Sequence, residues 1–117
     1  MGSWGFGNFD NDAAIDMTVG ALEPITAEIE AFCSSDRVGV EDIDSVVACV
    51  EIHLALLAQC KAPRPPRQTV NALRGKVLRL FDEQIDQLKP TAEYKVARRG
   101  ALSQALDDYA AQAGSDA

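Results

Sequence analysis

Cys49 and His53 have the residue types and the spacing that a metal site or a nucleophile pair requires. They are four residues apart, so a helix places the thiol and the imidazole on one face, and both groups bind zinc. Cys60 shares that face, but at about 1.5 Å per residue it lies about 16 Å from Cys49, too far to share one ion. Zinc would need two further ligands, with Cys33 as the first candidate. The alternative, which we favour, is that these thiols pack in the core as small hydrophobic groups.

Other signs of catalysis are few. The sequence contains neither a Gly-Lys-Ser/Thr phosphate loop nor a Gly-x-Ser-x-Gly turn, and His53 is its only histidine. Glu51 lies in an apolar stretch; it either is covered and accepts hydrogen bonds from the N-terminal Gly-Trp-Gly segment, or faces solvent. We therefore predict a protein that is not an enzyme and has no cofactor. The alternative is a metal-dependent enzyme that uses Cys49, His53 and Glu51.

The elements that would position these side chains are helices, because apolar residues recur at steps of three and four. The first helix has the apolar stripe Ile15, Val19, Leu22, Ile25, Ile29 and Phe32. Pro24 lies inside this stripe and removes one backbone hydrogen bond, so the helix is either kinked or broken there into two helices. Residues 34–39 form the next break.

Three further helices are expected. Residues 42–60 are apolar over most of the helix circumference and end at the proline-rich residues 61–67. The third helix contains Val70, Leu73, Val77, Leu80, Phe81, Ile85 and Leu88 and stops at residues 89–90. The fourth begins at Pro90 or Thr91 and continues to Gly114. The sequence thus predicts one all-α domain over residues 1–117, an antiparallel bundle of four long helices, with an irregular cap at 1–10 and a frayed tail at 113–117.

Charge is distributed unevenly along the chain. Residues 1–60 hold eleven acidic residues and one basic residue, net −10, whereas residues 61–117 hold ten basic and seven acidic residues, net +3. We expect the two halves to pair with each other as weak surface ion pairs. The alternative is that the first half presents an acidic face to a basic partner. Nucleic acid is not predicted as a partner, because the acidic half opposes the positive field of residues 61–99.

The N-terminus combines glycines with aromatic rings and ends in acids. Trp4, Phe6 and Phe9 alternate with glycines, and Asp10 and Asp12 precede the first helix. These residues would form a cap, with the rings packed on the bundle end and the acids at the positive end of the helix. The alternative is that Trp4, Phe6, Phe9, Asp10 and Asp12 form a partner-binding patch.

This motif, Gly2-x-Trp4-Gly5-x-Gly7-x-Phe9-Asp10-Asn11-Asp12, resembles the opening of an uncharacterised bacterial family, the domain of unknown function numbered 4259. A weaker likeness covers the alanine-containing helix around Ala48, Glu51 and Ala55. The resemblance implies a bacterial, largely helical protein. It transfers no catalytic residue, because the family has no established activity, and beyond Pro63 the likeness is lost.

The function expected from these patterns is macromolecular binding. No stretch reaches the roughly 20 apolar residues of a membrane span, and residues 1–9 lack the charge and apolar run of a signal peptide, so we expect a cytoplasmic protein. Its partner would be another protein, and the most concrete hypothesis is an immunity or antitoxin-like inhibitor that covers the basic cleft of a toxin. The alternative is a self-associating helical module, a homo-oligomer in which acidic and basic halves meet.

Overall fold

The fold consists of four α-helices and two short 3-10 helices. A computed structural model describes residues 7–8 and 11–114. The α-helices are α1 (Asp12–Ser34), α2 (Ile43–Gln59), α3 (Arg67–Gln84) and α4 (Ala92–Ala111), with η1 (Val40–Asp42) before α2 and η2 (Ile85–Leu88) after α3. The described residues contain no β-strand. The expected all-α class and the four helices are confirmed.

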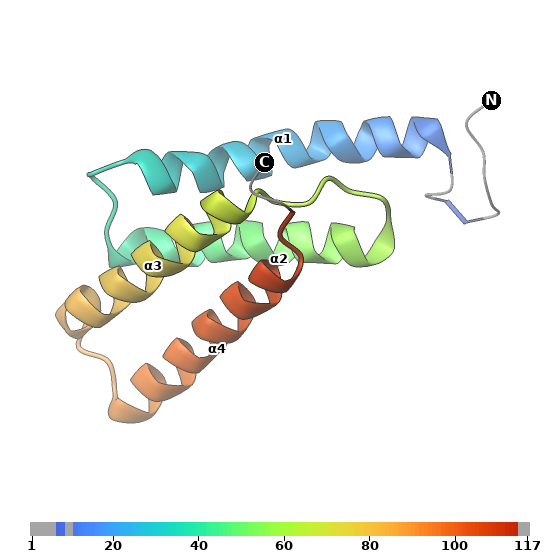
Figure 1. The fold of residues 1–117 in the computed structure, drawn as a ribbon. Helices are drawn as coiled ribbons and strands as arrows, with labels where there is room; N and C mark the ends of the chain where they lie inside the picture. Colours follow the sequence, from blue (N-terminus) through green and yellow to red (C-terminus); the bar gives the residue numbers. More distant parts are fainter. Residues whose placement is uncertain (1–6, 9–10, 115–117) are drawn as a thin grey trace.

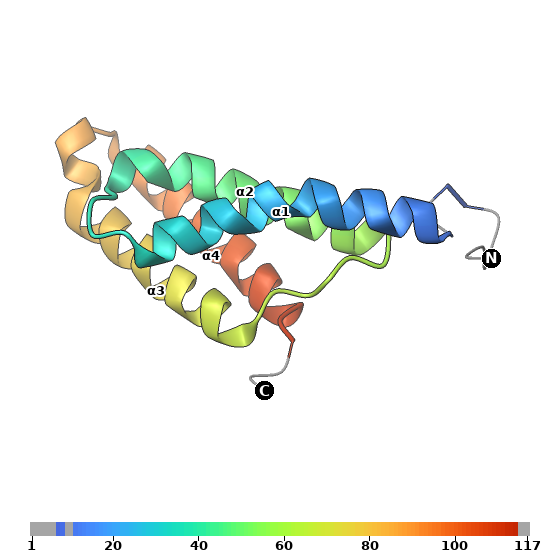
Figure 2. The same cartoon turned by 90° about the horizontal axis from the view of Figure 1, so that it is seen from above.

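The helices form two antiparallel hairpins that lie one against the other. α1 packs beside α2 and α3 beside α4, while α2 contacts α4 and α1 contacts α3. Figure 1 shows the α3–α4 hairpin inclined to the α1–α2 hairpin and placed toward one end of it. Seen from above, the N-terminal half of α1 and the C-terminal half of α2 extend past the second hairpin (Figure 2). The molecule is accordingly long, 55 × 27 × 21 Å.

Helix α1 is continuous through Pro24, so of the two alternatives, a kinked helix or a break into two helices, the break does not occur. Pro24 and Gly20 both lie on the solvent face, where water can bind the carbonyl of Gly20 that receives no hydrogen bond from the proline. Thr26 adds local hydrogen bonds, since its hydroxyl donates to the carbonyls of Leu22 and Glu23, both at 3.2 Å. A proline on an exposed face is therefore accommodated without ending the helix.

The buried stripe of α1 differs from the expected one in its first half. Val19 is 39% exposed, and Thr18 takes the buried position instead, with 4% of its surface exposed. Thr18 tolerates burial because its hydroxyl donates to the carbonyl of Ala14 at 2.9 Å. Further along, Leu22, Ile29 and Phe32 are buried as the spacing predicts. Helix α1 therefore contributes to the apolar core mainly through its C-terminal half.

Lys76 joins the two hairpins at the C-terminal end of α1. Its ammonium group donates to the backbone carbonyls of Phe32 at 2.6 Å, Cys33 at 3.2 Å and Ser35 at 2.5 Å. It also lies 5.4 Å from the centre of the Phe32 ring, within the range of a cation–π interaction. The last carbonyls of a helix have no partner within the helix and carry partial negative charge, so a cation there is stabilising.

We expect Lys76→Met to lower the free energy of unfolding by about 1–3 kcal/mol, because it removes the charged donor from three carbonyls while keeping an apolar stem of similar length. The measurement is urea denaturation followed by circular dichroism. Lys95→Met is the control: Lys95 pairs with the carboxylate of Asp86, which is 75% exposed, so its loss should cost less than about 1 kcal/mol. Equal losses in the two variants would show that Lys76 contributes no more than a surface ion pair.

Candidate functional site

His53 is the centre of a buried hydrogen-bonded chain. It is 1% exposed and lies on α2, facing α4 and the proline-rich residues that connect α2 to α3. Its Nδ1 atom is 2.7 Å from the hydroxyl of Tyr109, and its Nε2 atom is 2.7 Å from the carbonyl oxygen of Pro63. A carbonyl can only accept, so Nε2 carries the hydrogen, and Nδ1 then accepts from the Tyr109 hydroxyl. This geometry fits a neutral imidazole with its hydrogen on Nε2.

Burial determines the protonation of these side chains. It lowers the pKa of His53, and the hydrogen bond to the Pro63 carbonyl offsets this only in part. Burial also raises the pKa of the Tyr109 hydroxyl, so Tyr109 remains a donor. The same cause raises the pKa of the thiols of Cys33 and Cys49, which leaves them protonated.

These facts argue against metal binding or nucleophilic chemistry at His53 and Cys49. Both ring nitrogens of His53 already have partners, and Cys49 is a buried thiol with a raised pKa. Cys60 donates to the carbonyl of Leu56 at 3.0 Å. Over residues 7–8 and 11–114, no three His, Cys, Asp or Glu side chains gather in a way that could hold a metal ion. Cys49 lies in the core and Cys33 packs against it, whereas Cys60 lies outside the core cluster, next to Thr18.

Glu51 faces solvent, so the interpretation in which it is covered and bonded to the N-terminal segment is wrong. The neighbouring positions 52 and 55 are exposed as well, which places Glu51 on the outer strip of α2. A carboxylate there keeps its hydration without any protein donor. The alternative of an enzyme built from Cys49, His53 and Glu51 therefore loses its acidic member, which points away from the other two.

The connection between α2 and α3, residues 60–66, is held by its carbonyl groups. His53 donates to the carbonyl of Pro63, and the backbone N–H of Gly114 donates to that of Pro65 at 2.8 Å. Prolines have no N–H to satisfy, so this mostly exposed segment, in which only Pro65 is buried, can be fixed through its carbonyls. A pocket of about 200 Å³ lies between this connection and α1, with His53 and Tyr109 in its lining.

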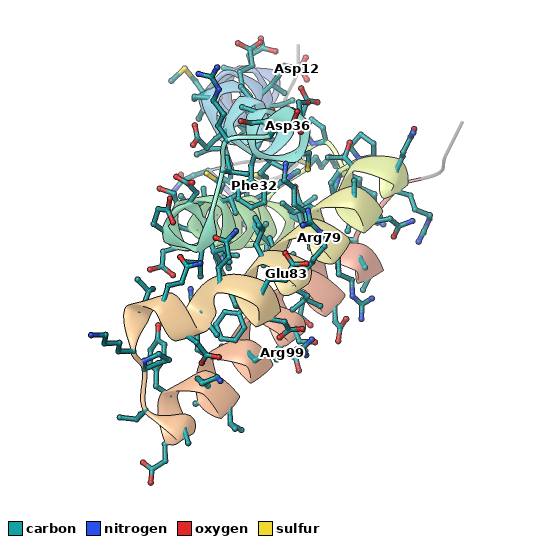
Figure 3. The ribbon with its side chains drawn as sticks, turned by 90° about the vertical axis from the view of Figure 1, so that its left-hand side faces the viewer. Asp12, Phe32, Asp36, Arg79, Glu83 and Arg99 are labelled. Carbon is teal, nitrogen blue, oxygen red and sulfur yellow. The ribbon has the colours of Figure 1, made fainter. Side chains whose placement is uncertain are left out.

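The ion pairs do not join the two halves of the chain as we expected. Five ion pairs are seen among the described residues, and four of them lie within the second hairpin: Arg74–Asp107, Arg79–Glu83, Lys95–Asp86 and Arg99–Asp82. Of these five, one crosses to the first half of the chain, Arg98–Asp44 at 2.7 Å. The second hairpin supplies most of its own counter-charges. Figure 3 shows Arg79 and Glu83 on α3 and Arg99 on α4, away from Asp12 on α1.

The first hairpin consequently keeps an acidic surface. Helices α1 and α2 contain seven carboxylates and no lysine or arginine: Asp12, Asp16, Glu23, Glu28, Glu30, Asp44 and Glu51. All seven are exposed. Of these seven carboxylates, only Asp44 has an ion-pair partner among the described residues. The uneven charge of the sequence is therefore retained on the surface of the first hairpin, because the ion pairs seen among the described residues join α1 to no lysine or arginine.

The predicted N-terminal patch falls mostly outside the described residues. Trp4, Phe6, Phe9 and Asp10 are not among them, and the proposal that they cap the bundle or bind a partner stays a prediction. Asp12 is the exposed first residue of α1. The N-cap of this helix is Asn11, whose side-chain oxygen accepts from the backbone N–H of Ala14 at 2.8 Å.

Tyr109→Phe should lower the free energy of unfolding by about 1–3 kcal/mol, because it removes the only donor to Nδ1 of a buried imidazole. Chemical denaturation followed by circular dichroism measures this. Tyr94→Phe, on the same helix, is the matched control: Tyr94 is 48% exposed, and its hydroxyl can bind water, so the change should stay within about 0.5 kcal/mol. A Tyr109→Phe protein as stable as wild type would show that the hydroxyl does not hold His53.

Stability should fall between pH 7.5 and pH 5.5. The folded protein holds His53 neutral with a lowered pKa, whereas the unfolded chain protonates it below about 6.5. The unfolded state therefore binds more protons, and the free energy of unfolding decreases as the pH falls from about 6.5 toward the folded pKa. The measurement is urea denaturation at several pH values. His53→Gln should lack this part of the dependence; parallel losses in both proteins would assign it to other groups.

Comparisons with known proteins add no relative: no protein-family model, no curated protein and no solved structure matches the chain. The resemblance of the N-terminal motif to the family of unknown function therefore stays a prediction. No described helix has the length and apolar character needed to cross a membrane. The site must be interpreted from its own geometry, in which a buried histidine supports the fold and an acidic hairpin faces outward.

Proposed function

We propose that this chain is a non-catalytic binding protein whose α1–α2 hairpin covers a basic surface of another protein. The observation that carries the proposal is the acidic face of that hairpin, on which six of seven carboxylates have no ion-pair partner among the described residues. An unneutralised acidic face attracts a basic partner over a Debye length of about 10 Å and raises the association rate. Both ring nitrogens of His53 are used in hydrogen bonds within the fold, to Tyr109 and Pro63.

The most concrete form of this function is inhibition. A small acidic protein that docks on the basic active cleft of a toxin excludes its substrate, as an immunity protein or antitoxin does, without any catalytic residue of its own. The rigid scaffold suits this task. Lys76 and His53 fix the two hairpins with hydrogen bonds, so little order would have to be gained on binding.

Self-association through opposite charges has less support. It would need the basic groups of one copy's α3–α4 hairpin to meet the acids of another copy's α1. Most of those groups are already in ion pairs, including the two-bond pair of Arg99 with Asp82 at 2.8 and 2.9 Å. Exchange of one surface pair for another yields little free energy. A basic partner brings cations that are not yet paired.

The triple variant Glu23→Gln, Glu28→Gln, Glu30→Gln tests the proposal. We expect it to fold normally, because all three side chains are exposed, and to lose capture of a basic protein from the chain's native cells, measured by affinity purification and quantitative mass spectrometry. Growth rescue by coexpression with the captured protein then tests inhibition. The control Glu83→Gln, Asp86→Asn, Glu93→Gln makes the same change in net charge on the second hairpin. If no basic protein is lost selectively with the α1 variant, the acidic face is not a binding surface.

A further inference from the structure

The connection between α2 and α3 ends in a short polyproline II helix. Pro66 has φ −64° and ψ 137°, close to the values of that helix. The rings of Pro63 and Pro65 fix φ near the same value, and a residue that precedes a proline favours the same extended conformation. Figure 2 shows the connection, in yellow-green, running along the edge of the molecule to the start of α3. Residues 63–66, Pro-Arg-Pro-Pro, therefore form about one turn of polyproline II helix.

The exposure of side chains along this segment repeats every three residues. A polyproline II helix has three residues per turn, so residues i and i+3 share a face. One face packs on the fold, since Pro65 is buried and Ala62 is half-buried. The other two faces are exposed, and one carries two prolines while the other carries two arginines: Pro63 and Pro66, and Arg64 and Arg67. The segment thus presents paired proline rings beside paired guanidinium groups.

Hydrogen bonds hold the segment to the fold and leave other groups of it without partners. The carbonyls of Pro63 and Pro65 both accept hydrogen bonds from the fold. The carbonyl of Arg64, which lies between them in the chain, accepts from no described residue. Neither Arg64 nor Arg67 forms an ion pair with a described residue. The segment is therefore fixed in an extended shape before a partner binds, which lowers the entropy cost of binding.

A pocket borders the exposed prolines. It has a volume of about 200 Å³, and residues 63–66 form one side of its lining. The other side belongs to α1 and includes Leu22 and Ile29. An aromatic side chain of a partner that stacks on the proline rings can enter this pocket and contact apolar groups of α1 as well.

The chemistry of the two exposed faces selects the class of partner. Proline rings in a polyproline II helix pack into grooves that are lined by aromatic side chains. Indole and phenol groups in such a groove are also hydrogen-bond donors, which the Arg64 carbonyl can accept. The guanidinium groups of Arg64 and Arg67 pair best with carboxylates. A nucleic acid would pair with the arginines but would leave the proline rings without a matching surface.

We propose that residues 63–67 are a docking segment for a partner domain whose groove is lined by aromatic rings and flanked by carboxylates. The rings of the groove pack on Pro63 and Pro66, and one of them enters the pocket beside α1. A donor in the groove binds the Arg64 carbonyl, and the carboxylates face the arginines. This inference goes beyond the proposed function and does not depend on it, because the docking segment lies outside the α1–α2 hairpin.

The test uses the full chain, labelled with ¹⁵N, and a panel of SH3 and WW domains as probes, because their grooves are lined by aromatic rings. We expect at least one domain to bind, with chemical-shift changes centred on the amides of Ala62, Arg64 and Arg67. If no domain of the panel binds, or if the changes centre on another part of the chain, the proposal is overturned.

Pro63→Ala combined with Pro66→Ala tests the ring contacts. Both prolines are exposed and the backbone carbonyls are kept, so the fold should be retained, which circular dichroism checks. We expect at least about tenfold weaker binding of the domain. Pro24→Ala, at an exposed proline of α1, is the matched control and should change the affinity less than about twofold. Unchanged affinity of the double variant would mean that charge alone drives binding, as for a polyanion such as nucleic acid, and would overturn the proposal.

Arg64→Gln combined with Arg67→Gln tests the pairing with carboxylates. We expect about tenfold weaker binding and a smaller loss of affinity with added salt than in wild type. Arg37→Gln combined with Lys89→Gln makes the same change in net charge at two exposed cations outside the docking segment, and should alter the affinity less than about twofold. Equal weakening in the two double variants would assign the effect to net charge and contradict a docking segment.

Discussion

The hydrogen-bonded chain Tyr109–His53–Pro63 is the constraint on which the packing of this protein depends. It ties α2 to α4 on one side and to the α2–α3 connection on the other, within a core that is otherwise apolar. Helices held by apolar contacts alone can slide along one another at little cost. A buried hydrogen-bond donor and acceptor meet in only one relative position of the helices, and in any other position both remain unsatisfied. No buried side-chain nitrogen or oxygen among the described residues lacks a hydrogen-bond partner. The imidazole thus acts as a structural group.

The position of the α2–α3 connection determines where the second hairpin lies and hence which surfaces stay free. With Pro63 and Pro65 held by their carbonyls, α3 begins against the middle of the first hairpin. Lys76 then reaches the end of α1 and binds its carbonyls rather than a carboxylate. The remaining cations of α3 and α4 pair mostly across their own hairpin. Among the described residues, the acids of α1 have no ion-pair partner, and the second hairpin covers only one end of the first.

Local patterns predicted the elements well because they are properties of short segments. Apolar steps of three and four gave four helices, and the three prolines near residue 65 ended the second one. The sequence did not decide between a kink and a break at Pro24, because the cost of a proline in a helix depends on whether the carbonyl that it leaves unpaired faces water. Val19 fits the helical spacing yet is half exposed, because an apolar residue is buried only where another helix covers it.

The candidate site was the part least accessible from sequence. The four-residue spacing of Cys49 and His53 predicts that they share one helix face, and both are buried on α2. The partners of His53 could not be predicted in this way, because Tyr109 and Pro63 are 56 and 10 residues away and no local pattern links either of them to His53. The sequence alone determined that the first half of the chain is acidic, that it contains one histidine, and that four segments form helices. Tertiary structure alone decided that the acids of α1 have no ion-pair partner among the described residues, because ion pairs depend on which helices meet in space. It also decided that the second hairpin covers only one end of the first.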